Sequence, residues 1–258
     1  VRFKGQKILA SESVSALETR GHYDFPADVT KMWPPKHGAP FDGNADWTVS
    51  AFDNVASYWG TTHEANWKTI KKQDFMAGTF IWTGFDYLGE PDPYPYPARS
   101  SYFGIVDLAG FPKDVYYMYQ SEWTTKPVLH LFPHWNWQKD QEVDVWAYYN
   151  NADEVELFLN GKSLGKKSKQ NDDLHIAWKV KFEPGTLKAI SRKDGKVVLE
   201  KEIHTAGQAS KIDLKADKAS IKNDGYDLVY VTVSVVDKDG NLIPNANDLI
   251  NFEVTGGG

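Results

Sequence analysis

One glutamate in this chain, Glu12, has the setting of a catalytic carboxylate. It follows a short apolar run, residues 8–10, and opens into a small polar segment that ends at Arg20-Gly21. The carboxyl end of a buried strand is where (β/α)8 barrels place catalytic groups. Hydrolysis of a glycosidic bond with retention needs two carboxyl groups, one as nucleophile and one as acid/base. Glu12 is therefore a candidate nucleophile, and a solvated loop glutamate is the alternative.

A second segment, near residue 80, carries groups that suit a sugar. Residues 78–82 are β-rich and nearly all apolar, as buried parallel strands are, and Trp82 ends the run. Its indole offers a flat apolar surface to the C–H face of a pyranose, with core packing as the alternative. Asp86 and Glu90 follow on the loop, where each could orient a sugar hydroxyl or stabilise the loop. Further candidates for pocket walls are Tyr23, Trp33 and Trp59.

Other chemistries have little support. Residues 63–67 begin like a zincin motif, but Trp67 stands where the second histidine should be. His130 and His134 are four residues apart, but Pro133 between them prevents a helical ligand pair. The chain has no cysteine, no glycine-rich phosphate loop and no Gly-x-Ser-x-Gly elbow. We therefore expect no cofactor and no metal.

Charge and hydropathy exclude two further classes of protein. The net charge is −6 with both signs interspersed, which argues against the basic stripe of a nucleic-acid-binding surface. No apolar run approaches the length that spans a membrane. The expected partner is a carbohydrate rather than a nucleic acid or a membrane. A homo-oligomer is compatible with the sequence, which does not fix the oligomeric state.

The elements that must position these groups change in kind along the chain. Eight of the ten tryptophans fall before residue 140 and none lies beyond Trp178, which indicates different domains in the two halves. Residues 1–124 read as α/β, with predicted strands at 6–10, 78–82 and 102–106 and helices at 57–73 and 112–123. Two βα units make a quarter of an eight-fold barrel, which needs roughly 250 residues. We expect the remainder of the barrel to lie upstream of Val1.

Beyond Val128 the sequence predicts only strands. Short alternating runs meet at Asn160-Gly161 and Asp194-Gly195, the pairs that favour two-residue hairpins, and predict a β-sandwich over residues 125–207. Residues 208–258 predict strands at 212–214, 226–236 and 251–254, with a turn at Asp239-Gly240. This is too little for the roughly 100 residues of an immunoglobulin-like domain, so we expect an incomplete one.

Several motifs resemble family 2 glycoside hydrolases, especially β-galactosidases of gut Bacteroidetes. Residues 7–21, KILASESVSALETRG, resemble the nucleophile segment, and residues 78–91, GTFIWTGFDYLGEP, resemble the eighth barrel strand and its loop. Residues 100–114 resemble the link into the last barrel helix. Residues 150–167 and 211–254 are similar to the β-sandwich and the appended immunoglobulin-like domain of the family.

The resemblance implies a retaining exo-β-glycosidase with Glu12 as nucleophile and Trp82 at the sugar subsite. It implies the C-terminal part of a TIM barrel followed by immunoglobulin-like sandwich domains. The acid/base of the family is the glutamate of an Asn-Glu pair on an earlier strand, and this chain contains no such pair. We therefore expect the chain to be inactive without the missing N-terminal part of the enzyme. We also expect a periplasmic or secreted enzyme of a Gram-negative bacterium, with the signal peptide outside this chain.

Two departures from the family bear on the substrate. Ser15 stands where well-studied enteric β-galactosidases have a histidine, and residues 96–104 lack the Asn-x-Lys element of β-glucuronidases. A terminal β-galactoside is the expected substrate, although Arg99 keeps an acidic sugar open. The alternatives are a β-glucuronidase or β-mannosidase, or sandwich domains that bind carbohydrate or act as spacers without catalytic duty. A sugar platform would use Trp135, Trp137, Trp146 and Trp178.

Overall fold

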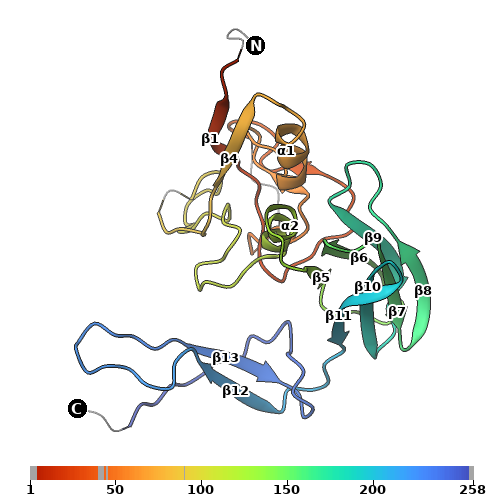
Figure 1. Cartoon of the computed structure of the whole chain (residues 1–258). Helices are drawn as coiled ribbons and strands as arrows, with labels where there is room; N and C mark the ends of the chain where they lie inside the picture. Colours follow the sequence, from red (N-terminus) through yellow and green to blue (C-terminus); the bar gives the residue numbers. More distant parts are fainter. Residues whose placement is uncertain (1–4, 40–43, 45, 90, 256–258) are drawn as a thin grey trace.

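The computed structural model describes residues 5–39, 44, 46–89 and 91–255, and this part of the chain is mostly β with few helices. Figure 1 shows an α/β part at the N-terminus, two sheets on one side of it, and a separate C-terminal hairpin. Within the described ranges no helix has both the length and the apolar character needed to cross a bilayer.

The α/β part contains a pair of parallel strands, β1 (Ile8–Val14) and β4 (Met76–Trp82). Their register shifts between Ala10 and Ser13, so that Ser11 and Glu12 have no register partner on β4. The predicted strand at 6–10 begins and ends before the observed strand β1, which spans Ile8–Val14. Glu12 therefore lies inside the strand, at its irregularity, rather than after it.

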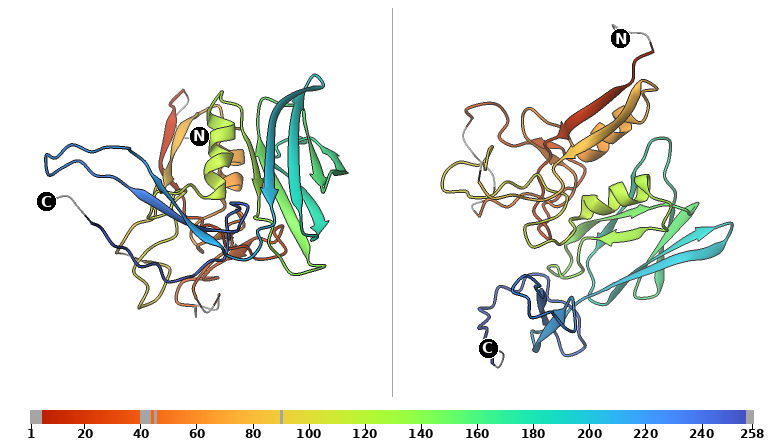
Figure 2. Two further views of the ribbon diagram at one scale, coloured as in Figure 1. Left: turned by 90° about the horizontal axis from the view of Figure 1, so that it is seen from below. Right: turned by 60° about the vertical axis from the view of Figure 1, so that its left-hand side comes forward.

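Helices α1 (His63–Ile70) and α2 (Asp114–Trp123) complete the α/β part. α1 is shorter than the predicted 57–73, because the N–H groups of Ser57 and Thr61 donate to carbonyls at the end of β1 and Gly60 closes a turn onto Ser57. α2 begins two residues after Pro112, and in both views of Figure 2 it lies between the β1–β4 pair and the two sheets. The short strands β2 (Lys31–Met32) and β3 (Val55–Ala56) also pair in parallel.

The predicted strand at residues 102–106 is wrong. The segment makes isolated bridges only and bonds to the loop that follows β4, as in Ile105 N–H to the Thr83 carbonyl (3.0 Å) and Asp86 N–H to the Val106 carbonyl (2.9 Å). Gly104 permits this close approach, because a Cβ at this position would lie 2.0 Å from the Asp86 nitrogen. Two loops this close pack on each other rather than extending a sheet.

Residues 129–204 form two facing antiparallel sheets. The sheet β11–β10–β7–β8 contains Lys196–His204, Thr186–Lys193, Glu154–Leu159 and Lys162–Lys167, and the sheet β5–β6–β9 contains Leu129–Phe132, Glu142–Tyr149 and His175–Lys181. Their alternating apolar side chains share one core, including Trp135, Leu157 and Trp178. Both predicted hairpins are confirmed: β7–β8 turns at Asn160-Gly161 and β10–β11 at Asp194-Gly195, each with two positive φ angles.

Strand β6 joins the two-sheet unit to the α/β part because both of its faces are buried. Val143 and Val145 face the core between the sheets. Trp146 and Tyr148 belong to a second core with Phe52 of the α/β part. The two units are thus packed together through a shared apolar interface.

The last described segment contains the antiparallel pair β12 (Lys211–Ala216) and β13 (Val231–Val236), which Figures 1 and 2 show apart from the other sheets. The predicted strand at 226–236 is therefore only half formed. The predicted strand at 251–254 is wrong: these residues are exposed and have no partner strand in the described part of the chain. An extended segment needs such a partner to become a strand.

Candidate active site

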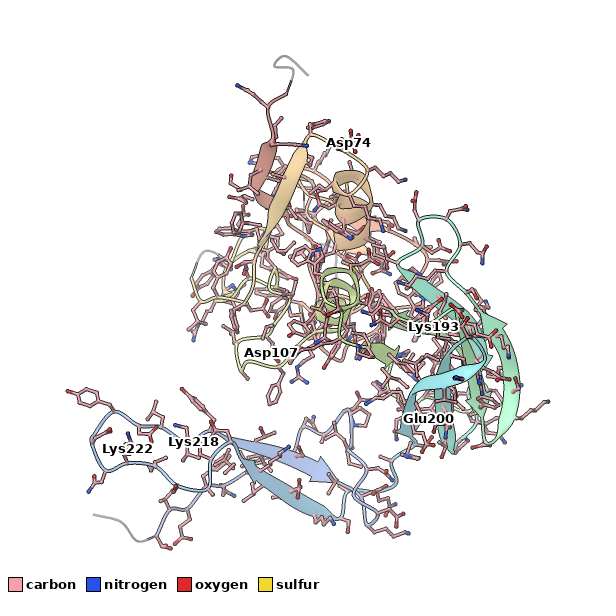
Figure 3. All side chains as sticks on the ribbon, in the orientation of Figure 1. Asp74, Asp107, Lys193, Glu200, Lys218 and Lys222 are labelled. Carbon is pink, nitrogen blue, oxygen red and sulfur yellow. The ribbon has the colours of Figure 1, made fainter. Side chains whose placement is uncertain are left out.

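Glu12, Trp59 and Trp82 line one pocket together with Ser15, Tyr87, Asp92 and Phe103. β1 and β4 run in the same direction, and Val14 is opposite Trp82, so the candidate carboxylate and indole emerge near the same end of the pair. Figure 3 helps to locate that end: Asp74 precedes β4, whereas Asp107 lies among the loops beyond its carboxyl end. The pocket encloses about 150 Å³.

Glu12 is an exposed carboxylate within this pocket. The neighbouring Ser13 instead bonds across the strand pair, with its Oγ 2.6 Å from Thr79 Oγ1 and accepting from Asn66 Nδ2 at 3.3 Å. Those contacts hold the irregular part of β1 to β4 and to α1. The segment that carries Glu12 is therefore fixed while its carboxylate remains open to a ligand.

Two indoles form walls of the pocket. Trp82 is 38% exposed and meets the Tyr87 ring edge to face, with centroids 5.9 Å apart. The peptide bond that follows Trp82 is cis. Trp59 is 45% exposed and contacts the rings of Tyr58 and Phe103. Both indoles thus keep apolar surface available beside a carboxylate, which is the surface that a pyranose can stack on.

The loop that carries Trp59 is fastened to the end of β1. The Ser57 N–H and hydroxyl both donate to the Ser15 carbonyl, at 3.0 and 2.8 Å, and the Thr61 N–H donates to the Val14 carbonyl at 2.9 Å. Gly60 permits this approach, since a Cβ there would lie 2.4 Å from the Val14 oxygen. The position of Trp59 relative to Glu12 therefore depends on the contacts of Ser57 and Thr61, on either side of Trp59, with Ser15 and Val14 at the end of β1.

Asp86 does not line the pocket. It is 9% exposed, and its Oδ1 accepts from Lys113 Nζ and from the Gly104 N–H, both at 2.8 Å. Lys113 Nζ also donates to the carbonyls of Glu18 (2.7 Å) and Tyr102 (3.2 Å). Burial raises the pKa of Asp86 and lowers that of Lys113 despite their mutual attraction. The pair ties the loop after β4 to the loop after β1, so Asp86 acts here through loop stabilisation.

Tyr23 and Trp33 also lie away from the pocket around Glu12. The Tyr23 hydroxyl donates to Asp114 Oδ2 at 2.7 Å, beside the sheet β5–β6–β9. Trp33 is buried against Tyr94 in the core of the α/β part. Glu90 lies outside the described residues.

Four pocket residues were not selected as site residues from the sequence. Ser15 has a positive φ of 59°, which turns the chain out of β1 at the pocket edge. Asp92 supplies a second carboxylate, and Tyr87 and Phe103 support the two indoles. Two of them could have been recognised as candidates from the local sequence. Ser15 is a polar residue next to a strand end, and Asp92 is a polar residue within a proline-rich loop. The others depend on tertiary packing.

The chain matches two family models. Residues 140–199 match a domain of unknown function, DUF4982, and residues 212–258 match the glycoside hydrolase family 2 C-terminal domain 5. Both matches fall outside the segment that carries the pocket.

Curated relatives and solved structures cover that segment as well. The chain is 57% identical over 256 residues to β-galactosidase BoGH2A of Bacteroides ovatus, which covers 99% of this chain and 30% of the relative. It is 39% identical over 197 residues to a putative β-glucuronidase of Formosa agariphila, covering 74% and 19%. The structure of a β-glycosidase from Bacteroides vulgatus superposes with a TM-score of 0.77 at 31% identity, covering 91% and 32%. The chain thus spans less than a third of the length of these relatives.

Proposed function

Because the chain belongs to glycoside hydrolase family 2, we propose that it is part of a retaining exo-β-glycosidase with Glu12 as nucleophile. In this proposal residues 1–124 are the C-terminal part of the catalytic TIM barrel. Residues 125–207 are a β-sandwich domain, and residues 208–258 are the start of an immunoglobulin-like domain. The activity belongs to the whole enzyme, of which this chain supplies half of the reacting groups.

The observation that carries the proposal is the shared pocket of Glu12, Trp59 and Trp82 at the carboxyl end of a parallel strand pair. This is the end at which barrels gather their catalytic groups. Its volume of about 150 Å³ is smaller than the roughly 300 Å³ at which ligand pockets begin. We attribute the difference to walls that the rest of the barrel provides.

The chemistry assigned to Glu12 is nucleophilic. Its carboxylate oxygen forms a bond to the anomeric carbon while the glycosidic C–O bond breaks, and an acid from another barrel strand protonates the leaving oxygen. Water then attacks the anomeric carbon of the glycosyl–Glu12 ester and releases Glu12. In this step the group that first acted as the acid accepts a proton from the water. Trp82 and Trp59 would stack on the sugar ring, while Ser15 and Asp92 are placed to bond its hydroxyl groups.

A terminal β-galactoside is the substrate we favour. The relative with 57% identity is named a β-galactosidase, whereas the relative with 39% identity is named a putative β-glucuronidase. The second candidate is accordingly a β-glucuronidase or β-mannosidase. With either substrate, the enzyme would act in the periplasm or outside a Gram-negative cell, where it would release terminal sugars from glycans.

The spacer role of the sandwich is favoured over a sugar platform. Trp135, Trp146 and Trp178 are each at most 5% exposed, so these three indoles fill cores rather than present flat surfaces. Trp137 alone of the four is partly exposed, and its ring stacks on His134 with centroids 4.3 Å apart.

The test is a panel of nitrophenyl glycosides with the full-length enzyme and its Glu12→Gln variant. We expect β-galactoside hydrolysis in the parent and loss of several orders of magnitude in kcat for the variant, as for removal of other covalent nucleophiles. Glu200→Gln, on the outer strand β11 (Figure 3), is the matched control and should keep full activity. Preference for a glucuronide or mannoside would change the substrate assigned to the enzyme. An active Glu12→Gln variant would contradict the assignment of Glu12 as the nucleophile.

A further inference from the structure

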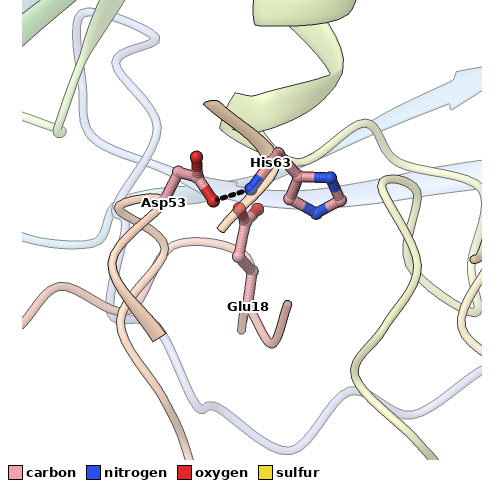
Figure 4. A group of neighbouring side chains, drawn as sticks. All are labelled: Glu18, Asp53 and His63. Carbon is pink, nitrogen blue, oxygen red and sulfur yellow. Dashed lines mark hydrogen bonds between the residues drawn. The ribbon is translucent and has the colours of Figure 1, made fainter. Parts of the chain in front are cut away.

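Three buried side chains of the α/β part converge away from the pocket: Glu18, Asp53 and His63 (Figure 4). Each offers one atom that can bind a cation, and these atoms all lie within 4.8 Å of one another. The three residues are 1%, 7% and 1% exposed. They come from the loop after β1, the segment before β3 and the first turn of α1, so no local motif in the sequence reveals them.

Glu18 is the anomaly in this cluster. Both of its carboxylate oxygens are buried, and neither has a hydrogen-bond partner within the described ranges. Buried carboxylates are normally paired, hydrogen-bonded or bound to a metal, because an uncompensated buried charge is costly. Something must therefore compensate this carboxylate in the folded protein.

The ammonium group of Lys113 already has three hydrogen-bond partners. Lys113 Nζ bonds to Asp86 Oδ1 at 2.8 Å and to the main-chain carbonyls of Glu18 and Tyr102. Lys113 also lowers the pKa of Glu18 through its charge, but burial raises that pKa by more. Lys113 Nζ bonds to the main chain of Glu18 but not to its carboxylate.

The other two groups are oriented as ligands are. Asp53 accepts the N–H groups of His63 (2.8 Å) and Glu64 (2.7 Å), which fix its carboxylate at the start of α1. Nδ1 of His63 lies 2.9 Å from the Tyr119 hydroxyl. With Nδ1 as the donor, Nε2 keeps a lone pair, the arrangement found in metal-binding histidines.

We propose that Glu18, Asp53 and His63 bind a divalent transition-metal cation, Zn²⁺ or Mn²⁺. One imidazole and two carboxylates suit these ions better than an all-oxygen ion such as Mg²⁺. Ligand atoms around one ion at about 2.1 Å lie roughly 3–4 Å apart, within the 4.8 Å that bounds the present separations. Two carboxylates and a neutral histidine balance the charge of the cation, which removes the cost of burying Glu18.

The neutral histidine agrees with this assignment, whereas the two carboxyl groups must release their protons when the cation binds. Burial lowers the pKa of His63 to about 3, so the imidazole is neutral and free to coordinate near neutral pH. Burial raises the pKa of Glu18 and, together with Glu64, that of Asp53 to about 7. Full burial leaves no coordination position open to a substrate, so the site is structural. It joins the loop after the Glu12 strand to the start of α1.

The experiment is metal analysis of the full-length protein by inductively coupled plasma mass spectrometry, after dialysis and after reconstitution with Zn²⁺ or Mn²⁺. We expect about one ion per chain, and a melting temperature that falls by several degrees with a chelator and recovers when the metal returns. The Zn²⁺ and Mn²⁺ arms distinguish the two ions. A reconstituted protein without a stoichiometric ion, or without a chelator-dependent shift, overturns the proposal.

The Glu18→Gln variant distinguishes two explanations for the buried Glu18: a carboxylate that binds a metal ion, and a carboxyl group that is protonated. The amide has nearly the shape of the neutral acid, so it preserves a protonated site but removes a metal ligand; metal affinity should fall about ten-fold or more. Glu64→Gln is the control, because this buried glutamate follows His63 but bonds to His175 instead, and its metal content should not change. Retention of the ion in Glu18→Gln contradicts the proposal even if stability falls.

Discussion

At the scale of single residues, Glu12 is accessible because β1 is irregular. A regular parallel pair would give Ser11 and Glu12 partners on β4, but the register shift between Ala10 and Ser13 leaves both without one. Irregularities of this kind recur next to active sites, where they redirect a side chain. Ser13 then fixes the same segment to Thr79 and Asn66.

Removal of either indole should weaken the enzyme without unfolding it. A loss of about 2 kcal/mol, as for a tryptophan at an interaction hot spot, lowers kcat/KM about thirty-fold in Trp82→Ala and in Trp59→Ala. Trp123→Ala is the matched control, since Trp123 is as exposed as Trp59 (45%) but lies on α2. Equal effects of all three changes would show that the pocket does not bind the sugar. The measurement is steady-state kinetics with a nitrophenyl galactoside.

Residue types revealed part of the candidate site and concealed the rest. A carboxylate after an apolar run and a tryptophan at a strand end can be recognised locally, and the structure places both in one pocket. For Asp86 the sequence leaves open whether it orients a sugar hydroxyl or stabilises its loop, and the structure buries it against Lys113, a residue 27 positions away. Neither that pairing nor the cluster around Glu18 follows from spacing, because the partners come from separate segments.

At the scale of elements, the loop with Gly60 decides where Trp59 stands. Gly60→Ala introduces a methyl group 2.4 Å from the Val14 carbonyl oxygen and 2.8 Å from the Cβ and carbonyl oxygen of Ser15. These atoms belong to the backbone or are attached directly to it, so they cannot move aside easily. We expect a loss of about 1–3 kcal/mol in unfolding free energy from this overpacking. The loop must also move away from Glu12, so kcat/KM falls.

Gly84→Ala is the control for this change. Gly84 lies in the loop after Trp82, but a Cβ there meets nothing within 4 Å. Thermal denaturation and kinetics of both variants make the comparison, and a Gly60→Ala enzyme that matches Gly84→Ala would contradict the assigned role of the loop.

Lys113 provides a second test at this scale. Lys113→Met leaves Asp86 buried without its partner and removes the donor to two loop carbonyls, which should destabilise the protein by about 3–5 kcal/mol. The double variant Lys113→Met with Asp86→Asn removes the uncompensated charge and should recover part of the loss. Denaturant unfolding of the single and double variants measures this coupling. A double variant less stable than the sum of the two single changes would count against a buried pair.

Elements were predictable where local chemistry decides them. The Asn-Gly and Asp-Gly hairpins form because both residues adopt positive φ, and α2 begins just after its proline. Residues 102–106 and 251–254 have strand-like composition but do not form strands. In the first case the loop after β4 takes up the backbone groups, and in the second the described chain offers no partner.

At the scale of the whole molecule, β1 and β4 carry more exposed apolar surface than a finished sheet. Ile8, Leu9 and Phe80 are 44%, 51% and 61% exposed, although parallel strands are normally covered on both faces. The chain spans 30% of its relative BoGH2A, so the rest of such an enzyme is large enough to cover this surface.

The chain tested alone should therefore be inactive. Residues 1–258 offer the proposed nucleophile and the proposed aromatic walls, but the acid/base expected from the family belongs to an Asn-Glu pair that this sequence lacks. We expect no hydrolysis of nitrophenyl galactoside by the isolated chain, measured beside the full-length enzyme at equal concentration. Turnover by the isolated chain that Asp92→Asn abolishes would instead make Asp92 the second carboxylate.

The most direct measurement is covalent labelling of the full-length enzyme with a 2-deoxy-2-fluoro-galactoside, followed by peptide mapping. The fluorine slows hydrolysis of the glycosyl–enzyme, so the nucleophile keeps its sugar. We predict a single labelled peptide that contains Glu12, and no label in the Glu12→Gln variant. A label on any other carboxylate, with Glu12 unmodified, would contradict the assignment of the site.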